Sequence, residues 1–156
     1  MTTFLDTNII IALLDENHSH HTWSVTELVN RKAEGPAIVS DIVYCEVGVG
    51  MADKASLDAA IEALGLERFP SKDEALFRAG QAFLKYRRDH QGQKLGVLPD
   101  FLIGAVAEIE ETPLMTINSK DFTGYFPGLR LITPPPPVQA QSAVVMPAFG
   151  ADGAAK

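Results

Sequence analysis

Short apolar runs alternate with helical patterns through residues 1–133, and this alternation limits the possible folds more than any other feature. The candidate strands are Thr3–Leu5, Ala37–Val39, Arg68–Phe69, Leu114–Ile117 and Leu129–Ile132. Helical patterns fill most of the intervals between them. Strands that alternate with helices are joined by right-handed crossovers, which gives a mostly parallel sheet covered on both faces. We therefore predict an α/β fold with three layers, α/β/α, around a central sheet of four to five strands.

Local signals set the expected helix limits. The helices are expected over His20–Lys32, Asp41–Met51, Leu57–Leu64, a longer segment up to Asp89, and Pro99–Glu110. Ser56 is expected to cap the third of these helices and Gly65 to end it. Ser71 and Glu74 have the spacing of a capping box, which would open the longer helix. The buried stripe of that helix is expected to contain Leu76, Ala79, Phe83 and Tyr86.

Residues 134–156 differ in composition from the rest of the chain. Pro134–Pro137 form a run of four prolines, and the following residues are rich in Ala, Gly and Val. A proline run cannot continue a helix or a central strand. We predict one domain over 1–133 and a Pro/Ala/Gly-rich, disordered C-terminal tail over 134–156.

The composition is that of a globular protein. Hydrophobic residues make up 46% and charged residues 21% of the 156 residues, and the formal net charge is −7. No apolar run approaches the roughly 18 residues that cross a bilayer, and the N-terminus lacks the pattern of a signal peptide. The single cysteine, Cys45, excludes an internal disulfide. We expect a cytoplasmic protein that has no membrane partner.

Acidic and amide side chains follow the predicted strands. Asp6 comes directly after the first strand, and Asn118 and Asp121 follow the fourth. Asp100 opens the helix after Pro99, and the side chain of Glu46, in the helix after the second strand, leans back toward the N-terminus of that helix. Ligands bind beyond the carboxyl ends of parallel strands. We therefore expect these residues to converge at one edge of the sheet.

Most of these residues also have an explanation in local structure. Asp100 would favour the dipole at a helix start, Asp6 would cap a short helix over Ile9–Leu14, and Asp121 would stabilise a turn. Glu46 has a weaker structural explanation, because the residues around it, such as Val43 and Val47, are apolar. The joint occurrence of the four acids therefore carries more weight than any single one.

A cluster of carboxylates points to a divalent cation. Hard oxygen ligands select Mg²⁺ or Mn²⁺, and crowded carboxylates repel one another until a cation neutralises them. A bound Mg²⁺ can activate water and stabilise charge on a phosphoryl oxygen. This chemistry suits hydrolysis of a phosphodiester.

Four segments carry a resemblance to a known family, and they are Leu5–Asn8, Val43–Val47, Pro99–Ala105 and Thr116–Phe122. In this order and spacing the chain resembles PIN-domain ribonucleases, in particular the VapC-like toxins of type II toxin–antitoxin systems. The resemblance covers about 1–133. It implies a PIN-like fold and endonucleolytic RNA cleavage that depends on Mg²⁺, with Mn²⁺ able to substitute. It also implies neutralisation by a cognate antitoxin, and a homodimer for which an exposed apolar face around Leu57–Leu64 would be suitable.

The resemblance also assigns roles to residues. Asp6, Glu46 and Asp100 match the metal ligands, and Asp121 matches a further acidic catalytic position. Many members have Asp where this chain has Asn118, so the fourth place is open between Asn118 and Asp121. Thr7 and Thr116 are expected to support the carboxylates, as is Asn118.

A cationic segment precedes Asp100. Arg87, Arg88 and Lys94 are expected to bind RNA phosphates, with a solvated helix end as the alternative. Tyr86, in the same segment, is expected to belong to the packed face of the helix.

Other site types are weaker. The cluster of His18, His20 and His21 lacks the partners of a zinc site, and Cys45 is expected to be a buried structural thiol. A Mg²⁺-dependent phosphatase with Asp6 as nucleophile is an alternative, although Asn8 stands where that chemistry usually has a second aspartate. A catalytically weakened, PIN-like binding module is another alternative, which Asn118 supports.

Overall fold

A parallel five-stranded sheet forms the centre of the computed structural model, which describes residues 1–90 and 96–136. The strand order is β3-β2-β1-β4-β5, and every neighbouring pair is parallel. The strands are β1 (Thr3–Leu5), β2 (Ala37–Ser40), β3 (Glu67–Phe69), β4 (Leu114–Met115) and β5 (Leu131–Ile132). The predicted number and direction of the strands are therefore confirmed.

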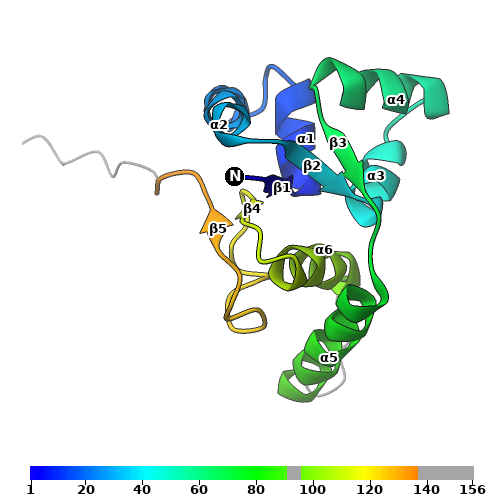
Figure 1. Ribbon diagram of the computed structural model, residues 1–156, viewed down its shortest axis with the longest axis vertical. Coiled ribbons are helices and arrows are strands. Elements are labelled where there is room, and N and C mark those ends of the chain that lie inside the picture. Colours follow the sequence, from blue (N-terminus) through cyan, green and yellow to red (C-terminus); the bar gives the residue numbers. More distant parts are fainter. Residues whose placement is uncertain (91–95, 137–156) are drawn as a thin grey trace, which may run out of the picture.

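Six helices cover the sheet in the described part of the chain. They are α1 (Thr7–Leu14), α2 (His21–Glu34), α3 (Asp41–Gly48), α4 (Lys54–Ala63), α5 (Asp73–Asp89) and α6 (Leu98–Ile109). Figure 1 shows α1 and α2 on one side of the strands and α5 and α6 on the other. The third helix, α3, packs against α1 and α6. This is the three-layer α/β/α arrangement expected from the sequence.

Strand β4 ends earlier than predicted, at Met115 instead of Ile117. The backbone N–H of Ile117 donates to the side-chain oxygen of Asn8 at 3.0 Å. Because this amide is bound to a side chain, it does not extend the ladder. The carboxyl end of the fourth strand is thus tied directly to the first turn of α1.

Two of the predicted helix starts are wrong. Helix α4 begins at Lys54, and its cap is Asp53, whose side chain accepts from the backbone N–H of Ser56 at 2.8 Å. Helix α5 begins at Asp73 after Lys72, which makes no side-chain capping bond, so Ser71 does not form the expected box. The end of α4 is as predicted. Gly65 has φ of 60°, a conformation that other residues rarely adopt.

The buried stripe of α5 contains smaller side chains than predicted. Ala79 and Tyr86 are buried as expected, but Leu76 is 43% exposed. Ala75 and Ala82 complete the buried face. The same spacing of three and four residues is satisfied by alanines, which allow α5 and α6 to approach closely.

The expected apolar dimer face around Leu57–Leu64 is not exposed. Leu57 and Ile61 are 5% and 6% exposed and belong to the core. Exposed apolar side chains lie elsewhere, among them Ile11 and Leu14 on α1 and Val49 after α3.

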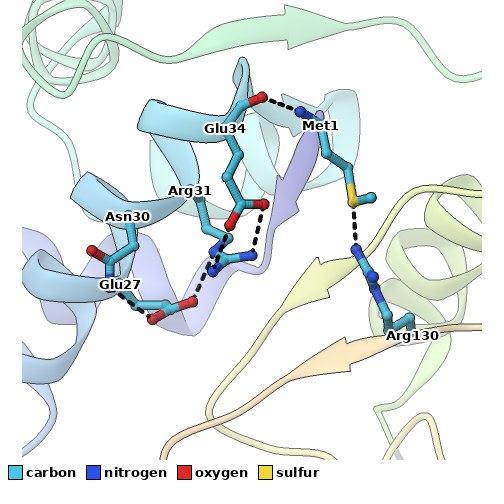
Figure 2. A network of polar contacts seen from close by, with 6 residues as sticks. All are labelled: Met1, Glu27, Asn30, Arg31, Glu34 and Arg130. Carbon is cyan, nitrogen blue, oxygen red and sulfur yellow. Dashed lines mark hydrogen bonds and ion pairs between the residues drawn. The ribbon is translucent and has the colours of Figure 1, made fainter.

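Polar contacts fix the start of β1 (Figure 2). The amino group of Met1 donates to the backbone oxygen of Glu34 at the end of α2, and Arg130, just before β5, contacts the Met1 sulfur. Within α2, Arg31 pairs with Glu27 at 2.8 Å and with Glu34 at 3.1 Å. The contacts of Met1 thus join the segment just before β1 to the end of α2 and to the segment before β5.

Among the described residues, no helix has both the length and the apolar character to cross a bilayer. Most of the predicted tail, residues 137–156, lies outside the described residues.

Candidate metal centre

Asp6 lies at the junction of the first strand and the first helix. It follows β1 directly and is the N-cap of α1, where its Oδ1 accepts from the backbone N–H of Thr7 at 2.7 Å. The residue is only 2% exposed. The capping role and the position at the carboxyl end of β1 are therefore both present, and neither excludes the other.

The second oxygen of Asp6 is also held. Its Oδ2 accepts from the side-chain amide of Asn8 at 2.7 Å and from the hydroxyl of Thr116 at 2.6 Å. The Asn8 amide reaches the Thr116 hydroxyl as well, at 3.1 Å. Thr116 is thus a support for Asp6, and Asn8 is a second support that sequence reasoning missed. The signals for Asn8 were its place in the matching segment Leu5–Asn8 and its polar side chain at the start of a mostly apolar helix.

The surroundings of Asp6 act on its charge in opposite directions. Burial raises the pKa of Asp6, while the hydrogen bonds from Thr116, Thr7 and Asn8 lower it. The nearby charge of Glu46 raises it further. The net result is a pKa above the usual value for an aspartate, in a position where the carboxylate is nevertheless fully hydrogen-bonded.

Glu46 reaches the same region from α3. Its Oε2 accepts from the hydroxyl of Thr7 at 2.5 Å. Thr7 therefore contacts two of the predicted ligands, Asp6 through its backbone and Glu46 through its side chain. Two apolar neighbours of Glu46 in the sequence, Val43 and Val47, are buried, whereas Val49, at the end of the helix, is 86% exposed. Cys45 is exposed, so the prediction of a buried thiol is wrong.

Asp100 carries the strongest electrostatic signature of the site. It lies in the first turn of α6, and its pKa is raised to about 7. Burial is the largest cause, followed by the charges of Asp121, Asp6 and Glu46. The four acids predicted from distant segments are therefore close enough to act on one another.

The loop after β4 contains both candidates for the fourth place. The side-chain amide of Asn118 donates to the Oδ2 of Asp121, and the backbone N–H of Asn118 donates to the Thr116 hydroxyl at 3.1 Å. Asp121 supplies the largest of the charges that act on Asp100, whereas Asn118 donates a hydrogen bond to Asp121 and adds no charge.

Gly104 sets the approach of this loop to α6. A Cβ atom at Gly104 would lie 2.9 Å from the rings of both Phe122 and Phe126. These rings are buried directly against the helix. Because Phe122 follows Asp121, the absence of a side chain at Gly104 lets Asp121 lie near Asp100.

The donor set fits a hard divalent cation in its chemistry. The acids supply carboxylate oxygens, which Mg²⁺ and Mn²⁺ prefer, and their mutual repulsion favours a cation. Among residues 1–90 and 96–136, no three Asp, Glu, His or Cys side chains lie in positions from which they could hold one ion together. Glu46 is instead held by Thr7, and Asp121 by Asn118. Each of these hydrogen bonds engages one carboxylate oxygen, Oε2 of Glu46 and Oδ2 of Asp121, which leaves the second oxygen of each for an ion.

The predicted RNA-binding cations lie at the end of α5. Arg87 and Arg88 are exposed in its last turn. Lys94 lies outside the described residues. Lys120, which sequence reasoning did not select, is exposed beside Asp121.

Comparison with known proteins agrees with this geometry. The sequence model of the PIN domain matches residues 3–124. Ribonuclease VapC10 of Mycobacterium tuberculosis is 27% identical over 133 residues, which cover 84% of this chain and 90% of that protein. The structure of VapBC2 from Rickettsia felis, bound to a promoter DNA fragment, has a TM-score of 0.65 at 23% identity and covers 85% of this chain and 98% of that one. A toxin–antitoxin complex from Klebsiella pneumoniae has a TM-score of 0.56 at 26% identity, with 84% and 96% covered. Since the PIN-domain match spans most of the sequence and includes Asp6, Glu46, Asp100 and Asp121, the chain belongs to the PIN-domain family.

Proposed function

We propose that this protein is a metal-dependent endoribonuclease toxin of the VapC type, which hydrolyses RNA phosphodiester bonds and is neutralised by an antitoxin. The observation that carries the proposal is the convergence of four carboxylates from separate segments, Asp6, Glu46, Asp100 and Asp121, which together with burial raises the pKa of Asp100. Perturbed titratable groups of this kind cluster at functional sites. The likeness to a protein named as a ribonuclease, over most of both chains, agrees with it.

In this proposal Asp6, Glu46 and Asp100 hold Mg²⁺, for which Mn²⁺ substitutes, and Asp121 completes the acidic site. When bound, the cation would supply positive charge at the scissile phosphate and make the attacking water more acidic. Asp6, held on both oxygens, fixes one side of the site. Burial and the charges of the neighbouring carboxylates raise the pKa of Asp100 to about 7, so a cation beside Asp100 would relieve this repulsion.

The supporting residues orient these acids. Thr7 positions Glu46, Thr116 positions Asp6, and Asn118 positions Asp121. Arg87, Arg88 and Lys94 are proposed to bind RNA phosphates. Two exposed guanidinium groups at the end of α5 support this role.

The test is cleavage of a long RNA with Mg²⁺ or Mn²⁺. We expect cleavage that EDTA abolishes and that Asp6→Asn and Asp100→Asn reduce by at least 100-fold, about 2.7 kcal/mol of transition-state stabilisation. Asp73→Asn, an exposed aspartate in the first turn of α5, is the control and should retain full activity. Cleavage in EDTA, or full activity of Asp6→Asn, would contradict the proposal.

The same experiment separates the two alternatives. A Mg²⁺-dependent phosphatase would release phosphate from small phosphomonoesters such as p-nitrophenyl phosphate. A binding module would leave RNA and phosphomonoesters intact and would bind no Mn²⁺ at saturation.

An apolar groove beside the site supports the antitoxin as a partner. It has a volume of about 400 Å³, and its lining includes Ile11, Leu14, Val47 and Val49 together with Glu46. Ile11, Leu14 and Val49 are exposed. We propose that an apolar segment of the antitoxin fills this groove and reaches Glu46, so that binding and inhibition are coupled.

Val49→Asp tests the groove, because Val49 is 86% exposed and the fold does not depend on it. The variant should lose antitoxin binding in co-purification while it keeps RNA cleavage. Val29→Asp, on α2 and 63% exposed, is the control. Unchanged inhibition of Val49→Asp by the antitoxin would exclude this groove.

The homodimer that the family resemblance implies is also a proposal. It is tested by light scattering after size-exclusion chromatography, where a monomer at micromolar concentration would contradict it.

A further inference from the structure

Two cations of α5 contact the loop of residues 119–126, which follows β4, and neither belongs to the sites described above. The Nη2 atom of Arg78 donates to the backbone oxygen of Tyr125 at 2.6 Å. The Nζ atom of Lys85 donates to the backbone oxygen of Gly124, also at 2.6 Å. Because the two acceptors are adjacent in the chain, α5 holds this loop at two neighbouring peptide groups.

Arg78 also joins the loop to α6. Its Nε donates to Oε2 of Glu108 on α6 at 2.7 Å, and its guanidinium lies 4.8 Å from the ring centroid of Phe126. Oε1 of Glu108 accepts from the backbone N–H of Gly128 at 3.1 Å. The side chains of Arg78 and Glu108 are only 26% and 15% exposed. Since charge-assisted bonds are stronger than neutral ones, this ion pair ties the end of the loop to both helices.

The middle of the loop is its least anchored part. Phe122 and Phe126 are buried and hold its two sides, but Thr123 and Gly124 between them are exposed. Gly124 has φ of 88°, and glycine loses more conformational freedom on folding than any other residue. In the described part of the chain, no backbone N–H donates to the oxygen of Gly124 or of Tyr125. The cations of α5 therefore supply bonds that the backbone does not.

Consecutive turns connect this part of the loop to Asp121. The backbone N–H of Phe122 donates to the oxygen of Ser119 at 3.2 Å, and the N–H of Tyr125 donates to the oxygen of Phe122 at 3.2 Å. Asp121 lies within these turns, so a shift of Tyr125 is transmitted to it. The place of Asp121 beside Asp100 therefore depends on where Tyr125 is held.

We propose that Arg78 and Lys85 are positioning residues of the acidic site, which hold the loop so that Asp121 stays beside Asp100. The proposal rests on the metal-dependent function proposed above and assigns part of the support of the site to α5. It also sets the sign of the effect. Loss of a positive charge would by itself strengthen the binding of a cation nearby, whereas loss of a positioning residue weakens it.

Amide hydrogen exchange in EDTA tests the positioning without metal or RNA. The amides to follow are those of Phe122 and Tyr125, which are hydrogen-bonded within the loop, measured relative to the amides of α2. In Arg78→Met they should exchange about 10-fold faster than in the wild type, the effect of losing one hydrogen bond to a charged group. Lys85→Met should act in the same direction and more weakly, because Lys85 is exposed.

The affinity for Mn²⁺ tests whether the positioning acts through Asp121. Arg78→Met should weaken Mn²⁺ binding about 10-fold, the lower end of the effect of residues that orient metal ligands. In an Asp121→Asn background the same change should have less than about a twofold effect, because the group that it positions is gone. Arg78→Lys, which keeps the charge, should recover part of the affinity.

Lys72→Met is the matched control for both measurements. Lys72 is an exposed cation at the start of α5 and pairs with Glu110 at 2.8 Å. This variant should leave the exchange of the loop amides and the affinity for Mn²⁺ as in the wild type.

The outcomes separate this proposal from the proposed function. Unchanged exchange in both Arg78→Met and Lys85→Met would overturn the positioning role even if the protein cleaves RNA. An equal loss of Mn²⁺ affinity with and without Asp121 would overturn it as well, as would an unchanged or higher affinity in Arg78→Met. If the loop amides respond as expected but the wild type binds no Mn²⁺ and cleaves no RNA, the positioning of the loop stands and the proposed function falls.

Discussion

The raised pKa of Asp100 implies that the acidic site destabilises the fold when no cation is bound. The unfolded value is 3.8 and the folded value is about 7, so the folded protein binds a proton at Asp100 more tightly than the unfolded chain does. Stability therefore falls as the pH rises through the window from about 4 to 7, and the full cost is present above pH 7. Asp100→Asn removes this cost, because asparagine has nearly the same shape and no charge.

The size of the effect follows from the shift. Each pKa unit corresponds to about 1.36 kcal/mol, so roughly three units set an upper limit of about 4 kcal/mol. Asp100 is partly exposed, and solvent screening reduces this to about 1–3 kcal/mol. In a domain of this size the variant should melt about 2–12 °C higher than the wild type at pH 8.

The assay is urea and thermal unfolding in EDTA at pH 8 and pH 5. The advantage of Asp100→Asn should be largest at pH 8 and should shrink by half or more at pH 5, where the wild-type carboxyl is protonated in the fold. Asp73→Asn is the control and should change little at either pH, because Asp73 is exposed. If Asp100→Asn is less stable than the wild type at pH 8 in EDTA, the repulsion inferred for this site is wrong.

Further predictions concern the cation and the residues around the acids. Mn²⁺ should raise the melting temperature of the wild type but not of Asp100→Asn, and the rise should fade below pH 7 as Asp100 is protonated; an equal rise in both proteins would contradict the assigned ligand. Thr116→Val should cost about 1–3 kcal/mol in urea unfolding, because the buried Asp6 loses a donor, whereas Thr116→Ser should keep most of the stability. Gly104→Ala should cost about 1–3 kcal/mol through its contacts with two rings, while Gly80→Ala, in α5 with open space around it, should gain up to about 1 kcal/mol. The same sign for both glycine variants would refute the packing argument.

The sequence allowed the sheet and the acidic edge to be predicted because both depend on patterns within short segments. Strand β1 was predicted with its observed limits, and the parallel order brought Asp6 and Asp100 to one end of the sheet, as their interaction requires. An acid at the end of an apolar run is visible without any knowledge of its neighbours.

The residues that were missed depend on contacts between distant segments. Asn8 supports Asp6 only because β4 brings Thr116 and Ile117 beside it, more than a hundred positions away in the chain. The cap of α4 was predicted wrongly for a different reason. Asp53 and Ser56 are both good capping residues, and which of them caps the helix depends on the backbone conformation.

Thr7 has a consequence for how variants of this protein will combine. Its backbone N–H binds Asp6 and its hydroxyl binds Glu46, so one residue connects two carboxylates that are forty positions apart. Loss of either carboxylate frees one side of Thr7 and weakens the placement of the other. In a double-mutant cycle, Asp6→Ala and Glu46→Ala, which remove the acceptors of Thr7, should therefore show epistasis, with a combined loss of activity smaller than the sum of the two single losses. Thr7→Val, which keeps the N–H and removes the hydroxyl, should reduce that coupling without removing a single charge.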